Sequence, residues 1–145
     1  MFGDLDHIGL LVRDLDAAVA RTQQAFGLPI ARTSHNAETG FSAVFLGEGR
    51  GSLEIFTIND PTLLAERLGE DDERIDHVAY RVTDIAAEAD RLRASGGRFC
   101  TNDRRSELPG PVEVSGGWRY LWTAPESTAG IAIQLIQAPA PEPRA

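Results

Sequence analysis

The chain contains one short pattern twice. The first copy, "LDHIGLLVRDL", begins at Leu5, and the second, "IDHVAYRVTDI", begins at Ile75. His7 and His77 are therefore 70 positions apart, and the aspartate and glycine that follow in each copy keep this separation. A period this long indicates a duplicated structural unit.

Each copy predicts a strand followed by a helix. In the first copy, Ile8, Leu10 and Val12 alternate with other residues, which is the period of a strand. Asp14 is typical of a helix N-cap, and Gly27 is typical of a helix end. The second copy repeats this order, with an aspartate before its helix and two glycines after it.

The remainder of each half predicts a pair of strands. Residues 41–49 and 51–59 flank a glycine-rich turn, and residues 117–125 and 130–137 correspond to them in the second half. The sequence thus predicts an α+β fold in which the order βαβββ occurs twice. We expect a single domain over residues 1–145, with module one at about 5–59, a linker with a short helix at 60–74, module two at about 75–137 and a proline-rich tail at 138–145.

Composition and charge narrow the function. A net charge of −8 disfavours nucleic acid and an anionic membrane as partners. All fourteen basic residues are arginine, which excludes lysine Schiff bases, pyridoxal-phosphate anchoring and Walker-type phosphate loops. No apolar run approaches the roughly 20 residues of a membrane span, and the first residues do not resemble a signal peptide, so we expect a cytoplasmic protein. Cys100 is interpreted as a packing residue.

Strand parity places both histidines of the repeat on one kind of face. The aliphatic positions of the two opening strands should lie under the helices. The opposite faces then carry His7 beside Gly9 and His77 beside Ala79. A histidine next to missing side-chain volume leaves room for a ligand.

Four motifs in order resemble the vicinal oxygen chelate superfamily, namely "DHIGLLVRDLDAAV", "LEIF", "DHVAYRVTDI" and "PESTAGIAIQL". This superfamily includes glyoxalase I, methylmalonyl-CoA epimerase, extradiol dioxygenases and bleomycin-resistance proteins, and the chain is most similar to its epimerase-like and glyoxalase-like branch. The resemblance covers roughly residues 5–137. It implies a cup-shaped mixed sheet with helices on its outer face, in which one residue from each of four strands points at one divalent ion.

The resemblance puts the ligand positions at His7, Glu54, His77 and Gln134. Two imidazoles and a carboxylate suit Fe, Mn, Co, Ni or Zn, and the sequence does not distinguish these metals. Such an ion acts as a Lewis acid on substrate oxygens, and Glu54 is also the candidate catalytic base. A buried Glu54 without a partner would be unfavourable, whereas Gln134 could instead form hydrogen bonds within the cup.

Two departures from the relatives bear on mechanism. The last strand normally carries a glutamate, but Gln134 does not accept a proton at neutral pH. The epimerase branch usually has a second glutamate where this chain has Ala43. Because epimerisation by proton exchange benefits from two acid–base groups, these departures disfavour ordinary methylmalonyl-CoA epimerisation. Glu48, on the glycine-rich turn, is a distant candidate for the missing group.

Other residues are candidates for substrate contacts. Arg81 could bind a carboxylate or phosphate, or form an ion pair with an acidic neighbour. Phe56 and Trp122 could line an apolar substrate pocket, although Trp122 could equally fill the core or a dimer interface. The arginines at 104–105 are more typical of a solvated surface, and His35 lies in a predicted polar loop and matches no ligand position. We expect a small-molecule substrate and a homodimer.

Three functions remain open from the sequence. The leading one is a metal-dependent isomerase or lyase that acts on a small carbonyl or thioester substrate through a metal-bound enolate. The second is an Fe(II)-dependent dioxygenase with a two-histidine, one-carboxylate site. The third is a non-catalytic protein that sequesters an apolar molecule in the cup.

Overall fold

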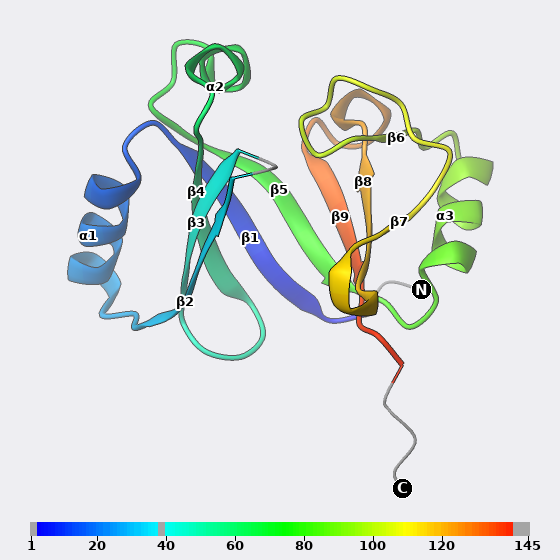
Figure 1. Ribbon diagram of the computed structural model, residues 1–145, viewed down its shortest axis with the longest axis horizontal. Coiled ribbons are helices and arrows are strands. Elements are labelled where there is room, and N and C mark those ends of the chain that lie inside the picture. The colour runs from blue at the N-terminus through cyan, green and yellow to red at the C-terminus, as the bar shows by residue number, and fades with distance from the viewer. Residues whose placement is uncertain (1–2, 38–39, 141–145) are drawn as a thin grey trace, which may run out of the picture. The chain divides into compact units, whose positions relative to one another are not determined.

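The computed structural model describes residues 3–37 and 40–140, which contain three helices and nine strands (Figure 1). The chain divides into two compact units, Asp6–His77 and Met1–Leu5 with Val78–Ala145. The helices are α1 (Leu15–Phe26), α2 (Pro61–Leu68) and α3 (Ile85–Ala94). The strands are β1 (Leu5–Val12), β2 (Ile30–Asn36), β3 (Phe41–Leu46), β4 (Ser52–Ile58), β5 (Glu73–Arg81), β6 (Phe99–Cys100), β7 (Val112–Glu113), β8 (Arg119–Thr123) and β9 (Ala132–Gln137).

The unit Asp6–His77 is built on the strand order β2-β3-β4-β1, with β5 next to β1. The predicted hairpin is present, because β3 and β4 are antiparallel and place Ala43 opposite Phe56. By contrast, β1 and β4 run parallel, and Gly9 lies opposite Glu54. This mixture of parallel and antiparallel pairs confirms the predicted α+β fold with a mixed sheet.

Helix α1 forms where the sequence predicts it. The Asp14 side chain accepts a hydrogen bond from the Ala17 backbone N–H at 3.0 Å, which satisfies one donor of the first turn. At the other end Gly27 adopts the left-handed conformation with φ 65°. The helix packs Ala18 and Val19 against Val12, so the aliphatic face of β1 lies under the helix, as predicted.

The opposite face of this sheet has its own apolar core. Leu11, Ala43, Phe45, Phe56 and Ile58 pack together there with three leucines of α2. The helix begins where Asp60 accepts hydrogen bonds from the backbone N–H groups of Thr62 and Leu63. Helix α2 thereby lies on the face that carries the polar residues of β1 and β4.

The second unit repeats the design with shorter strands. Its strand order is β9-β8-β6 with β5 next to β9, and β7 pairs with β8. Helix α3 packs Ile85 and Ala89 against Val82 and the strands β8 and β9. On β8 and β9, Trp122 lies opposite Gln134.

Three details differ from the sequence-based expectations. His35 lies in β2 and not in a loop, and its Nδ1 atom is 2.8 Å from the Ser42 hydroxyl on β3. The sequence did not predict β2 as a strand because the whole strand is exposed and its residues do not alternate between apolar and polar. Strand β5 begins at Glu73, so the acidic linker is shorter than expected. Residues 138–140 have no regular structure, and the rest of the predicted tail, 141–145, lies outside the described residues.

Among the described residues, no helix combines the length and the apolar character needed to cross a membrane. The division into two compact units does not test the prediction of a single domain, which stays a prediction.

Candidate metal centre

Three side chains meet on the face of the first unit that α2 covers. His7 comes from β1, Glu54 from β4 and His77 from β5. The two Nε2 atoms are 3.1 Å apart, and the Oε2 atom of Glu54 lies 3.2 Å from that of His7 and 3.0 Å from that of His77. The structure therefore brings three of the four predicted ligands together, and they form a group that could hold a metal ion.

Gly9 makes room for this arrangement. A Cβ atom at Gly9 would lie 2.1 Å from Cε1 of His77 and 2.5 Å from both ring nitrogens. Any larger residue would therefore collide with the imidazole. The sequence predicted room for a ligand beside His7 because Gly9 has no side chain. In the structure the His77 ring fills part of this space.

The aspartate that precedes each histidine orients its ring. The Nδ1 atom of His7 is 2.7 Å from Oδ1 of Asp6, and the Nδ1 atom of His77 is 3.1 Å from Oδ2 of Asp76. A carboxylate at Nδ1 fixes the proton there and leaves the Nε2 lone pair for a metal. The sequence shows this signal as the repeated Asp-His dipeptide, but its role was not predicted.

Asp76 is held in turn by helix α2. Nη2 of Arg67 donates to both carboxylate oxygens of Asp76 at 2.7 Å each, and the side chains of Arg67 and Asp76 are 8 % and 4 % exposed. Separating such a buried, charge-assisted pair would leave an uncompensated charge in the interior. The pair therefore holds the Asp76 carboxylate in place. The helix of the predicted linker thus supports the site, which sequence reasoning missed.

Aromatic rings line the site beside the imidazoles. The Phe45 ring contacts His7 edge-to-face, with centroids 5.4 Å apart, and the Phe56 ring is 5.5 Å from His77. Both phenylalanines are buried. The guanidinium carbon of Arg32 on β2 lies over the Phe45 ring, 3.5 Å from its centroid.

The buried charges shift the pKa values of all three central groups. Burial alone would lower the pKa of His7, but its hydrogen bonds to Asp6 and Glu54 outweigh burial and raise the pKa to about 9. The pKa of His77 is raised in the same way by Asp76 and Glu54 against the effect of burial. Burial would raise the pKa of Glu54, but its hydrogen bonds to the two imidazoles lower it to about 2.

Four charged side chains surround the two imidazoles, and their summed charge is one that a divalent cation can neutralise. With ionised carboxylates, Asp6, Glu54 and Asp76 carry three negative charges, and Arg67 carries one positive charge. These four buried or mostly buried side chains therefore have a net charge of −2 when both imidazoles are neutral. Either two protons on the histidines or one divalent ion between them neutralises this charge.

The spacing of the ligand atoms also fits an ion. A metal about 2.1 Å from each atom would hold neighbouring ligands about 3.0 Å apart in an octahedral arrangement and about 3.4 Å apart in a tetrahedral one. The observed separations are 3.0, 3.1 and 3.2 Å. The triad therefore fits one face of an octahedron, which leaves the other positions for substrate oxygens or further ligands.

The other predicted site residues, apart from Phe56, belong to the second unit. Gln134 is 8 % exposed on β9, and among the described residues its Oε1 atom has no hydrogen-bond partner. A buried oxygen without a partner is unfavourable, and the role of Gln134 as a metal ligand stays a prediction. Trp122 is half-buried and stacks on Tyr120, with centroids 5.7 Å apart. Arg81 is exposed at the end of β5.

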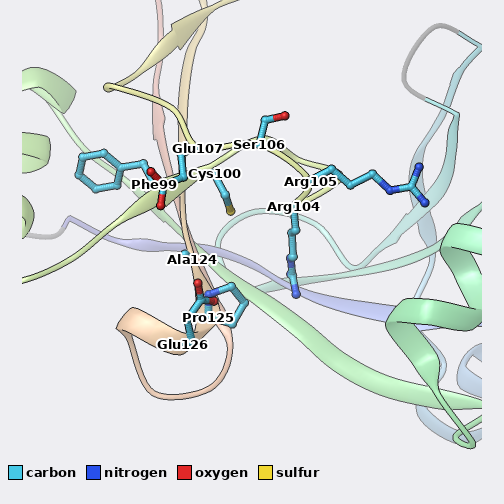
Figure 2. A pocket seen from close by; sticks show the side chains of 9 residues that line it. All are labelled: Phe99, Cys100, Arg104, Arg105, Ser106, Glu107, Ala124, Pro125 and Glu126. Atoms are coloured by element: carbon cyan, nitrogen blue, oxygen red, sulfur yellow. The ribbon is translucent and has the colours of Figure 1, made fainter.

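The remaining candidates lie elsewhere. Glu48 is exposed on the turn after β3. Cys100 is buried and lines a cavity of about 120 Å³ in the second unit, which Figure 2 shows. Arg104 and Arg105 line the same cavity, and Arg104 has a left-handed backbone with φ 64°. In Figure 2 the Arg105 side chain extends away from Cys100.

Comparison with known proteins agrees with this geometry. A family model described as a glyoxalase-like domain matches residues 5–145. Over 139 residues the chain is 28 % identical to the ethylmalonyl-CoA/methylmalonyl-CoA epimerase of Cereibacter sphaeroides, which covers 94 % of this chain and 99 % of that protein. It is 35 % identical to the lactoylglutathione lyase of Haemophilus influenzae over 134 residues, or 90 % of each chain.

The fold is also similar to that of a solved epimerase structure. The crystal structure of methylmalonyl-CoA epimerase from Mycobacterium tuberculosis superposes with a TM-score of 0.76 at 25 % sequence identity. The superposition covers 96 % of this chain and 89 % of that chain.

Proposed function

We propose, on the premise that the chain belongs to the glyoxalase-like domain family of the vicinal oxygen chelate superfamily, that it is a metal-dependent isomerase or lyase for a small carbonyl or thioester substrate. Its relatives are named as an epimerase and as lyases, and the chain is an enzyme of this general type. The observation that carries the metal-dependent proposal is the buried His7–Glu54–His77 triangle, with an aspartate behind each histidine.

In this proposal His7, Glu54 and His77 hold one divalent ion, and Gln134 is the predicted fourth ligand. When bound, the ion supplies Lewis acidity toward the carbonyl oxygen of the substrate. Asp6 and Asp76 keep the two imidazoles in the tautomer whose Nε2 atoms face the centre. The apolar rings of Phe45 and Phe56 exclude water from one side of the site.

The site offers fewer groups for proton transfer than for metal binding. Glu54 is the candidate base, but a carboxylate with a pKa of about 2 is a better ligand than a proton acceptor. Ala43 offers no acid–base group, although it is buried on the same face as Phe56. We therefore propose a reaction that needs only one weak base, and not the two-base inversion of a stereocentre.

The substrate contacts are also part of the proposal. Phe56 lies against His77, where it can contact an apolar part of the substrate. Arg81 and Trp122 stay predicted substrate contacts from the second module. The homodimer and the cytoplasmic location stay predictions as well.

The test of this proposal uses Glu54→Gln, which keeps the shape of the side chain and removes its charge. Zinc- and cobalt-loaded protein would be assayed with methylglyoxal plus glutathione and with a set of acyl-CoA thioesters. We expect turnover by the parent protein that chelation abolishes, and a loss of at least about 100-fold in Glu54→Gln with the fold retained. Turnover at the parent rate by folded, metal-loaded Glu54→Gln would remove Glu54 from the mechanism.

A second function is favoured by the composition of the triad. Two histidines and one carboxylate on one face of an octahedron are the ligand set of non-haem Fe(II) oxygenases. Anaerobically purified, Fe(II)-loaded protein would be tested for oxygen uptake with catechols as substrates. Catechol-dependent oxygen uptake would favour this second function, and its absence alongside zinc-supported turnover would favour the isomerase or lyase. A sequestering protein is the weakest alternative, since the matched relatives are named as enzymes.

A further inference from the structure

Arg32 is an exposed arginine near the candidate metal centre, and its guanidinium lies over an aromatic ring. Arg32 lies on the edge strand β2 and shares a face with Phe45, its cross-strand partner on β3. Its Cζ atom is 3.5 Å from the centroid of the Phe45 ring. At this distance the flat guanidinium is stacked on the ring. Stacking uses the face of the group and leaves the N–H donors at its edge available.

The Arg32 side chain has no carboxylate partner among residues 3–37 and 40–140. In this part of the chain the Arg32 guanidinium forms no ion pair and no side-chain hydrogen bond, and it contacts the Phe45 ring by stacking. Other arginines of this unit are paired, as Arg13 is with Asp72 and Arg67 with Asp76. In a chain of net charge −8, a cation without a carboxylate partner is poised to bind an external anion.

The stacked arginine is close to the triad. The Phe45 ring that supports Arg32 also contacts His7, with centroids 5.4 Å apart. The two distances together place the guanidinium carbon within about 9 Å of the His7 ring centre. Phe45 also lies opposite Glu54 in the register of β3 and β4. A short chain of two or three methylene groups can span this separation.

From these contacts we propose that Arg32 is the anion anchor of the substrate site. The substrate would carry, besides the two oxygens that face the triad, a carboxylate or other anionic group that the guanidinium edge binds bidentately. Phe45 acts as a positioning residue, because it holds the guanidinium flat beside His7. This inference rests on the proposed metal-dependent function and names its substrate class as anionic carbonyl compounds.

The test separates binding at the metal from binding at Arg32. Zinc-loaded protein would be titrated by calorimetry with acetohydroxamate, a neutral probe that chelates through two neighbouring oxygens. The same titration would use the monohydroxamates of malonic, succinic and glutaric acid, which add a carboxylate on arms of increasing length. Arg32→Gln removes the anchor, and Arg32→Lys keeps the charge without the planar fork.

The control is Arg21→Gln, which removes the same charge from α1, the helix on the opposite face of the sheet, where Arg21 pairs with Glu73. We expect at least one diacid probe to bind about 10- to 100-fold more tightly than acetohydroxamate in the parent protein and in Arg21→Gln. In Arg32→Gln this preference should fall below about threefold, and Arg32→Lys should lie between. Affinity for acetohydroxamate should be the same in all four proteins.

The outcomes are distinct. A carboxylate preference that survives Arg32→Gln, or no preference in the parent protein, would overturn the anchor and leave the metal centre intact. Failure of the parent protein to bind either zinc or acetohydroxamate would overturn the proposed function and this inference with it. Circular dichroism and zinc stoichiometry, expected to match the parent, show that Arg32→Gln is folded.

Discussion

At the scale of single residues, the Asp-His dipeptide accounts for most of the site. In each copy of the repeat, the histidine Nε2 atom faces the other histidine, and the carboxylate of the preceding aspartate accepts a hydrogen bond from Nδ1. The two aspartates are supported differently, because Asp76 is bound by Arg67 on α2 and Asp6 lies beside the turn before β4. The repeated dipeptide therefore places a carboxylate behind each imidazole, and in the second copy helix α2 holds this carboxylate.

Replacing Asp6 with asparagine tests the orienting role of this dipeptide. Asparagine keeps the volume but loses the charge that holds the His7 proton on Nδ1. We expect zinc affinity to fall about 10- to 100-fold, as for other second ligand shells, with little change in the stoichiometry. Competition with a chromogenic chelator measures the affinity, and Asp72→Asn on the exposed ion pair with Arg13 is the matched control. Equal affinities for the two variants would contradict the role of Asp6.

At the scale of elements, the sequence predicts what local pattern determines. Capping residues and alternation locate α1, α3, the two hairpins and the opening strands, and parity puts His7 and His77 on the face away from the helices. The ligand position at Glu54 came from the resemblance to the superfamily, and the structure places Glu54 beside both histidines. The remainder depends on contacts between distant segments. The Arg67–Asp76 pair requires α2 to fold over the sheet, and β2 lacks the apolar alternation by which strands are recognised.

The packing of β1 against β5 depends on Gly9. In Gly9→Ala the new methyl would overlap the His77 ring, which Asp76 holds in place. We expect the ring to be displaced and zinc affinity to fall at least about tenfold, with stability lowered by about 1–3 kcal/mol. Gly110→Ala serves as control, because its Cβ would meet only Arg93 Nη2, at 4.0 Å. Calorimetric zinc titration would contradict this account if Gly9→Ala bound like the parent.

Ala43 on β3 tests the missing acid–base group. A glutamate there would be largely buried beside Phe56 and Phe45, so its pKa should rise toward neutrality and make it an effective base. We expect the parent to exchange the α-proton of methylmalonyl-CoA slowly or not at all, and Ala43→Glu to exchange it at least about tenfold faster. The double variant with Gln134→Glu adds a second candidate base. Deuterium incorporation from D₂O measures the exchange.

Ala43→Gln has nearly the same shape as Ala43→Glu and no basicity, so it controls for packing changes. Efficient exchange by the parent protein, or equal exchange by the two Ala43 variants, would refute the interpretation of the missing carboxylates.

At the scale of the whole molecule, the metal centre links stability to pH. In the metal-free protein the pKa of His7 is raised from 6.5 to about 9, and that of His77 is raised as well. Their contribution to stability is therefore complete below about pH 6.5 and is lost as the pH rises through about 9. Glu54 acts oppositely, since its lowered pKa contributes stability that is lost only as the pH falls toward about 2.

A metal ion reverses the trend between pH 6.5 and 9, because it needs both imidazoles neutral. We expect the difference in melting temperature between zinc-loaded and zinc-free protein to grow across this range. Calorimetric unfolding at fixed ionic strength measures it, and His35→Gln, at an exposed position of β2, should leave the difference unchanged. A difference that is constant or shrinks with rising pH would contradict the linkage.

The most direct measurement is the number of divalent ions that each chain binds. Anaerobically purified protein would be titrated with cobalt and zinc by calorimetry, and its metal content determined by mass spectrometry. We predict one ion per chain in the parent, none in His7→Ala or His77→Ala with the fold intact, and one more weakly bound ion in Gln134→Ala, since a neutral amide is the poorer ligand. A parent protein that binds no ion, or a folded His77→Ala that binds one with parental affinity, would contradict the His7–Glu54–His77 metal centre.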